Sequence, residues 1–157
     1  MGESSETLNE EEMRRLVIDL AFDGDEQRFQ EFCDVIKASV PPGTTAVLRG
    51  SSITGERYTD GAPFDADGPG TSDLDLTLVG DEILEYFAIT GSYVPGVHTM
   101  PMGEDHPDIA PGLEPLRDEL VAMVGRPVNI QASRNFFMYI RGELMGQPYL
   151  TLFGSVG

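Results

Sequence analysis

The stretch TSDLDLTLV, residues 71–79, alternates polar residues with leucine at a period of two. Side chains two positions apart on a β-strand point to the same face of a sheet, roughly 6.6 Å apart along it. The pattern therefore predicts a strand whose leucines face a core while Asp73 and Asp75 lie together on the opposite face. This strand constrains the chain to a sheet with one apolar face.

Two helical patterns precede this strand. Residues 8–21 and 25–40 place apolar residues at helical spacing, and Asn9 and Asp25 are suited to cap the two helices. The sequence PPG at 41–43 ends the second helix, because proline removes a backbone donor and disfavours helix in the residue before it.

The remaining elements alternate between strands and helices. We predict a short strand over TTAVLRG at 44–50 and a loop-rich region over 80–111, with one helical turn around DEILEYF. An amphipathic helix follows at 113–124, and PVNIQA at 127–132 reads as the next strand. The last predicted elements are a helix over 133–146, capped by Ser133, and a strand over 148–153.

This order predicts a single α+β domain, residues 1–157, built on a small mixed β-sheet flanked by helices. A chain of 157 residues is long enough for one core. We divide the domain into N-terminal helices (8–40), a motif core (44–80), a loop-rich insertion (80–112) and a helix-strand-helix segment (113–157).

The formal net charge of −17, with only ten lysines and arginines, argues against long nucleic acid as a partner. A small anionic ligand stays compatible with this charge, because a metal ion and a few backbone amides can hold it locally. The single cysteine, Cys33, reads as a buried helical thiol. Since the sequence has neither secretory-signal features nor a membrane-spanning apolar run, we expect a cytoplasmic location and no membrane.

The sequence RGSSITG at 49–55 precedes the acidic strand and has the composition of a tight turn. Backbone N–H groups at Gly50, Ser51 and Ser52 could meet a phosphate, and Arg57 in the spacer could reach a triphosphate. Asp73 and Asp75 offer the oxygen ligands that Mg²⁺ prefers. Each pattern alone is commonly a turn, a solvated loop arginine or a solvated strand face.

Together, VLRGSS, a spacer and TSDLDLTLV resemble the signature of the DNA polymerase β-like nucleotidyltransferase superfamily, over residues 44–80. The resemblance implies that Gly50 and Ser51 hold the β- and γ-phosphates of a nucleoside triphosphate. It implies further that Asp73 and Asp75 bind one or two Mg²⁺ ions for transfer of a nucleoside monophosphate to a small-molecule or protein hydroxyl. The layout is also similar to nucleotidyltransferase-like domains linked to bacterial polymorphic toxins.

The sequence departs from this family in two respects. Many members carry a third carboxylate on a later strand, where this chain has Asn129 or Gln131, and the spacer over 51–72 is long for a minimal member. Neither amide is a general base at neutral pH. An alternative function is therefore a catalytically degenerate nucleotide-binding or interaction module of a toxin or antitoxin system. A third alternative is an acidic α+β domain whose motif match is accidental.

Other acidic and histidine-containing loops are weaker candidates. Asp60, Asp65 and Asp67 could add a metal ligand but are also common turn residues, and HTMPMGEDHPD at 98–108 fits no familiar zinc spacing. The sequence leaves open the nucleotide, the acceptor, the catalytic base and whether a second subunit completes the site.

Overall fold

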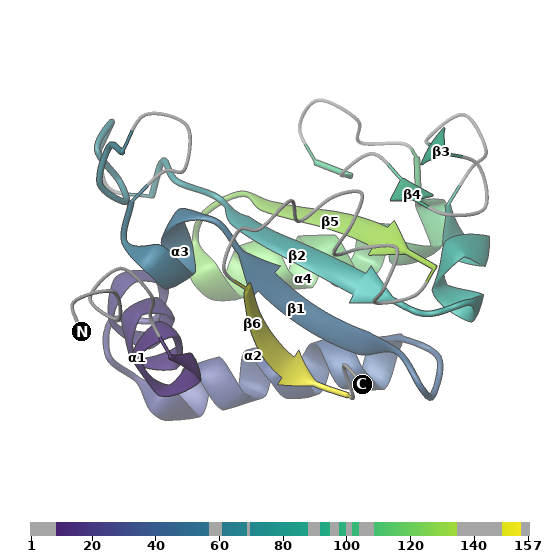
Figure 1. Cartoon of the computed structure of the whole chain (residues 1–157), viewed down its shortest axis with the longest axis horizontal. Coiled ribbons are helices and arrows are strands. Elements are labelled where there is room, and N and C mark those ends of the chain that lie inside the picture. The colour runs from purple at the N-terminus through teal and green to yellow at the C-terminus, as the bar shows by residue number, and fades with distance from the viewer. Residues whose placement is uncertain are drawn as a thin grey trace, which may run out of the picture.

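The computed structural model describes residues 9–56, 61–68, 70–87, 92–94, 98–99, 102–103, 109–134 and 149–154. They form a six-stranded mixed sheet with helices on one face (Figure 1), so the α+β class expected from the sequence is confirmed. The helices are α1 (Glu10–Ala21), α2 (Glu26–Ser39), α3 (Ser51–Thr54) and α4 (Glu114–Val124), with short 3₁₀ helices η2 (Glu82–Tyr86) and η4 (Pro111–Leu113). The strands are β1 (Thr45–Arg49), β2 (Leu74–Val79), β3 (Ser92–Val94), β4 (His98–Thr99), β5 (Val128–Ser133) and β6 (Tyr149–Phe153).

Strand β2 lies inside the sheet, whose order is β3-β4-β5-β2-β1-β6. It pairs antiparallel with β1 and parallel with β5. In this register Asp75 lies opposite Arg49 on one side and opposite Asn129 on the other. Cross-strand neighbours in a sheet are close enough for their side chains to interact.

The two faces of the sheet differ in chemistry, as the period of two in β2 predicts. Leu74, Leu76 and Leu78 belong to the main core, together with apolar residues of α1, α2 and α4. On the opposite face, Val47 and Val79 form a separate small apolar cluster, and the other positions of that face on β2 and β5 are polar. The polar residues of β2 and β5 therefore point away from the helices.

Both N-terminal helices begin at the predicted caps. Asn9 forms a reciprocal capping box with Glu12, and the carboxylate of Asp25 accepts from the N–H groups of Gln27 and Arg28. The interior of this helical layer is aromatic, and Phe22 makes edge-to-face contacts with its neighbours.

Cys33 lies in the same helical layer. It is buried, as the sequence predicts, and burial raises the pKa of its thiol to about 11. A thiol with a raised pKa stays protonated at neutral pH and is a poor nucleophile.

Two details of the sequence prediction differ in the structure. The loop-rich region over 80–111 contains the short strands β3 and β4, and its predicted helical turn is η2. Ser133, expected to cap a final helix, is the last residue of β5, and residues 135–148 lie outside the described part of the chain. Both differences have one cause: short strands and strand ends depend on partners across the sheet, which local patterns do not report.

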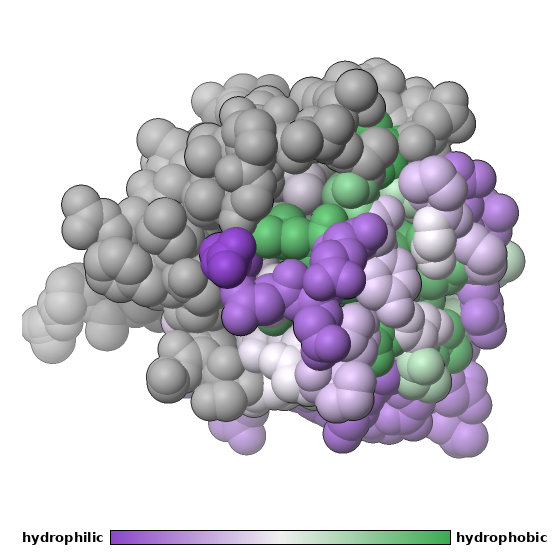
Figure 2. Space-filling view, turned by 90° about the vertical axis from the view of Figure 1, so that its right-hand side faces the viewer, coloured by the Kyte–Doolittle hydropathy of each residue, from purple (hydrophilic) through white to green (hydrophobic). Residues whose placement is uncertain are grey.

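The surface mixes hydrophilic and apolar residues. Figure 2 faces the end of the sheet where β2 and β5 finish, and hydrophilic residues there interrupt smaller hydrophobic patches. Within the described ranges, no helix has the length and apolar character that crossing a membrane requires.

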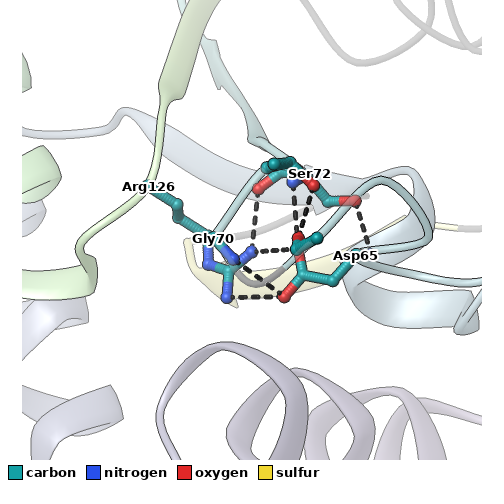
Figure 3. Close-up of polar contacts among 6 residues, drawn as sticks. Asp65, Gly70, Ser72 and Arg126 are labelled. Carbon is teal, nitrogen blue, oxygen red and sulfur yellow. Dashed lines mark hydrogen bonds and ion pairs between the residues drawn. The ribbon is translucent and has the colours of Figure 1, made fainter.

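An ion pair between Asp65 and Arg126 closes the spacer loop onto the start of β2 (Figure 3). Arg126 Nη1 and Nη2 donate to the two carboxylate oxygens of Asp65 at 2.8 and 3.1 Å, and Nη1 also donates to the Ser72 carbonyl at 2.9 Å. The N–H of Ser72 donates to Asp65 Oδ1 at 2.9 Å. The contact fixes the residue that directly precedes Asp73.

The geometry of this ion pair explains its electrostatics. Hydrogen bonds from Arg126 lower the pKa of Asp65 most. Burial raises it, but the backbone hydrogen bonds from Ser72 and Gly70 and the charge of Arg126 lower it further, so that the pKa is about 2. The Arg126 side chain is only 8% exposed and also stacks over the ring of Phe64, at 4.6 Å from its centroid.

Asp65→Asn tests this ion pair, because asparagine has a similar size and also tolerates the positive φ found at Asp65. We expect a loss of about 2 kcal/mol in unfolding free energy at neutral pH. A carboxyl group whose pKa is lowered in the folded state stabilises the folded protein at pH values above its unfolded pKa. This stabilisation disappears as the pH falls through the pKa of the folded state. Urea unfolding should therefore show the difference from wild type shrinking below about pH 4.

The control is Asp118→Asn, an exposed position on α4 that also removes one carboxylate. We expect it to change the unfolding free energy by less than about 0.5 kcal/mol. A loss in Asp65→Asn that is equal at all pH values would contradict the electrostatic explanation.

Candidate functional site

Gly50 joins β1 to α3 and packs against the carboxylate of Asp75. Its φ of +91° lies in a region that glycine adopts readily and other residues rarely do. A Cβ at this position would lie 2.8 Å from Asp75 Oδ2, closer than real Cβ atoms approach another atom. The turn and the acidic strand singled out in the sequence are therefore in direct contact, and the contact requires glycine.

The two serines of the turn differ in accessibility. Ser51 is half-buried, whereas Ser52 is fully buried in α3, a helix that contacts α1. Ser52 Oγ has no hydrogen-bond partner in the described part of the protein. A ligand at this turn would meet the backbone and Ser51 rather than the Ser52 hydroxyl. Arg57, the candidate triphosphate contact, lies outside the described residues.

Asp73 and Asp75 lie on the polar side of the sheet and share one hydrogen-bond donor. Asn129 Nδ2 donates to Asp73 Oδ2 at 2.6 Å and to Asp75 Oδ1 at 3.2 Å. The opposite end of this amide is covered, because a Cβ at Gly103 would collide with Asn129 Oδ1. Antiparallel bridging of Met102 to Ile130 holds the Gly103 backbone beside β5.

The electrostatics of the site centre on Asp75. Burial, followed by the nearby charge of Asp73, raises the pKa of Asp75 to about 6. The hydrogen bond from Asn129 and the charge of Arg49 act in the opposite direction but do not cancel the rise. The negative charge of Asp75 is thus incompletely compensated by the protein itself.

A second polar chain runs beside the carboxylates. Arg49 Nη2 donates to Gln131 Oε1 at 3.1 Å, and Gln131 Nε2 donates to the Thr99 carbonyl at 2.9 Å. Gln131 is buried, with both ends of its amide bonded. Asn129 and Gln131, the alternatives for the missing third carboxylate, therefore share the face of Asp75, but only Asn129 touches the two aspartates.

Among the other candidates, Asp65 is bonded to Arg126, as described above, and Asp60 lies outside the described residues. His98 lies in β4, and residues 104–108 are outside the described residues. Within the ranges that the structure describes, no group of three or more histidine, cysteine, aspartate or glutamate side chains is placed to hold a metal ion.

Comparisons with known proteins give no match, whether with protein-family models, with curated proteins or with solved structures. The function therefore has to be argued from the site itself. Sequence reasoning missed Arg49, which lies beside Asp75, and Arg126, which anchors the loop before Asp73. The only available signal for Arg49 was its place at the end of a strand, directly before Gly50.

The arrangement can bring a divalent cation and a phosphate together. The two half-buried carboxylates supply hard oxygen ligands, and the glycine turn against them lets a phosphate approach the backbone closely.

Asp75→Asn tests whether the site is electrostatically strained in the absence of a cation. A carboxyl group whose pKa is raised in the folded state destabilises the protein when it ionises. This destabilisation grows as pH rises from the pKa of the unfolded chain, 3.8, to the pKa of the folded protein, about 6. The asparagine variant, which can still accept from Asn129 Nδ2, should be more stable than wild type in chelator at neutral pH, by at most about 3 kcal/mol. The gain should vanish below about pH 4.

The measurement is urea unfolding, with Asp118→Asn on the exposed surface of α4 as the control. Asp118→Asn also removes one negative charge and should not reproduce the gain. A destabilised Asp75→Asn protein at neutral pH would contradict the assigned strain.

Proposed function

We propose that this chain is a Mg²⁺-dependent nucleotidyltransferase, which moves a nucleoside monophosphate from a nucleoside triphosphate to a hydroxyl of a small molecule or protein. The observation that supports it most is the packing of Gly50 against Asp75, with Asp73 joined to Asp75 through Asn129. This packing combines a backbone turn suited to phosphate with a carboxylate pair suited to a hard cation.

The donor set fits Mg²⁺, which usually binds one or two carboxylates and completes its shell with water and substrate phosphates. Asp73 and Asp75 would hold the ion. Repulsion between these two side chains contributes to the raised pKa of Asp75, and a bound cation would relieve it. When bound, Mg²⁺ offsets negative charge on the attacking and leaving oxygens of a phosphoryl transfer.

The protein's own part in the reaction is positioning. In the proposed transfer, the acceptor oxygen bonds to the α-phosphorus while the bond from that phosphorus to the β-phosphate oxygen breaks. Pyrophosphate leaves, and the acceptor's proton passes to solvent. The turn at Gly50 and Ser51 would hold the departing phosphates. The net charge of −17 disfavours tRNA or DNA as the acceptor.

A catalytically degenerate nucleotide-binding module is the second candidate, and Asn129 is the observation that favours it. By the resemblance, its amide would take the place of the carboxylate that many nucleotidyltransferases carry, and it donates to both aspartates. A donor in this position compensates the carboxylates without a metal. Such a module would bind a Mg²⁺-nucleotide without turning it over.

Thermal unfolding with each of the four nucleoside triphosphates, with and without Mg²⁺, tests the proposal. Binding to the folded state raises the apparent stability by mass action, by about 2.7 kcal/mol at one hundred times the Kd. We expect a Mg²⁺-dependent rise for at least one nucleotide, and its loss in Asp73→Asn/Asp75→Asn. That double variant is a sound control, because we expect it to fold stably.

Pyrophosphate release then separates the two candidates. Release that requires both aspartates supports the transferase, whereas Mg²⁺-dependent binding without release supports the degenerate module. The absence of any nucleotide-dependent rise would reject both and leave an acidic α+β domain with an accidental motif match.

Asn129→Asp tests whether the amide limits metal binding. The variant places a third carboxylate beside Asp73 and Asp75, and added ligand charge strengthens binding of hard cations, here by about tenfold for Mg²⁺. The measurement is isothermal titration of Mg²⁺ into the apoprotein. Asn129→Ala, which removes the amide without adding a ligand, is the control. Equal affinity in Asn129→Asp and Asn129→Ala would show that this position does not face the cation.

A further inference from the structure

Arg49 lies in the same row of the sheet as Asp75. It is the last residue of β1 and pairs with Asp75, which in turn pairs with Asn129. The three side chains therefore share the polar face of three neighbouring strands. Arg49 also directly precedes Gly50, so the guanidinium group and the glycine turn start from adjacent residues.

The guanidinium group lies across β2. Arg49 belongs to β1 and Gln131 to β5, yet Arg49 Nη2 donates to Gln131 Oε1 at 3.1 Å, which requires the side chain to span the strand between them. Gln131 is 3% exposed, and its own Nε2 is bonded to the Thr99 carbonyl. A buried amide bonded at both ends has one orientation, and because Gln131 pairs with Thr77 it holds the arginine diagonally across β2, next to the row of Asp75.

The charge of Arg49 acts on the site. It lowers the pKa of Asp75, against the larger effects of burial and Asp73. Arg49 thus lies beside Asp75, the one carboxylate in its row, and is itself half-buried. A half-buried arginine beside Asp75 and directly before the Gly50 turn is suited to a phosphate, because its planar fork matches phosphate oxygens.

We propose that Arg49 binds a phosphate oxygen of the triphosphate at this site, with Gln131 as its positioning residue. This inference rests on the proposed function and extends it, because it assigns phosphate recognition to a side chain of β1. Arg49 would then share the phosphates with the Gly50 turn while Asp73 and Asp75 hold the cation.

The variant Arg49→Met should change the binding affinities of two ligands in opposite directions. Removing a positive charge beside Asp75 should strengthen binding of Mg²⁺ alone severalfold, because the cation no longer faces a like charge. The same change should weaken binding of Mg²⁺ with inorganic tripolyphosphate by about tenfold or more, the usual contribution of a charged hydrogen bond. Both affinities are measured by isothermal titration on the full chain. A merely structural role would weaken both.

Two further variants keep the test decisive. Arg134→Met is the matched control, because it removes one positive charge paired with Asp81 near the opposite end of β2. It should change neither affinity appreciably. Arg49→Lys keeps the charge and length but loses the fork, so it should bind Mg²⁺ alone like wild type and tripolyphosphate more weakly. This variant carries the test if Arg49→Met does not fold.

The outcomes separate this inference from the function on which it rests. If wild type binds Mg²⁺-tripolyphosphate and Arg49→Met and Arg49→Lys bind it equally well, Arg49 has no role in phosphate binding and the proposed function stands. If wild type binds no tripolyphosphate with Mg²⁺, both the inference and the proposed function fail. Gln131→Met should weaken tripolyphosphate binding and leave binding of Mg²⁺ alone unchanged; unchanged tripolyphosphate binding would remove its positioning role.

Discussion

Burial of Leu74, Leu76 and Leu78 beneath the helical layer determines which way every polar residue of the site faces. Because side chains alternate along a strand, a slip of one residue would exchange the core and polar faces of β2. Fully burying one leucine contributes roughly 1.5–3 kcal/mol, so three leucines resist such a slip strongly. With β2 fixed between β1 and β5, Asp75 is held beside Arg49 and Asn129.

The register alone does not place Asp73, which precedes the first residue of β2. Its position depends on the loop before it, and the Asp65–Arg126 ion pair anchors that loop at Ser72. On the other side, the turn after β1 depends on Gly50, since any side chain there would displace the Asp75 carboxylate. The site is therefore held by three independent constraints: a buried strand, an ion pair and a glycine.

The sequence predicted what depends on local patterns. The helix caps at Asn9 and Asp25 and the two-faced strand β2 involve residues a few positions apart, so their patterns are visible without a fold. Asp65 and Arg126 are 61 residues apart, and no local pattern links them. In the sequence, Arg49 resembles an ordinary strand end. Its hydrogen bond to Gln131 depends on the order of the strands in the sheet, in which β2 lies between β1 and β5.

The difference between an active transferase and a degenerate module depends on the space between the two carboxylates. Asn129 now donates to both, and a cation bound there would have to replace these two bonds, each contributing roughly 1.5–3 kcal/mol as bonds to charged groups. Free Mg²⁺, which gives up bound water reluctantly, would therefore bind more weakly than Mg²⁺ that arrives with a triphosphate. A Mg²⁺-triphosphate complex would arrive with phosphate oxygens already in its shell and would gain further contacts from the turn at Gly50. In the proposed site, metal and nucleotide would therefore bind together rather than in sequence.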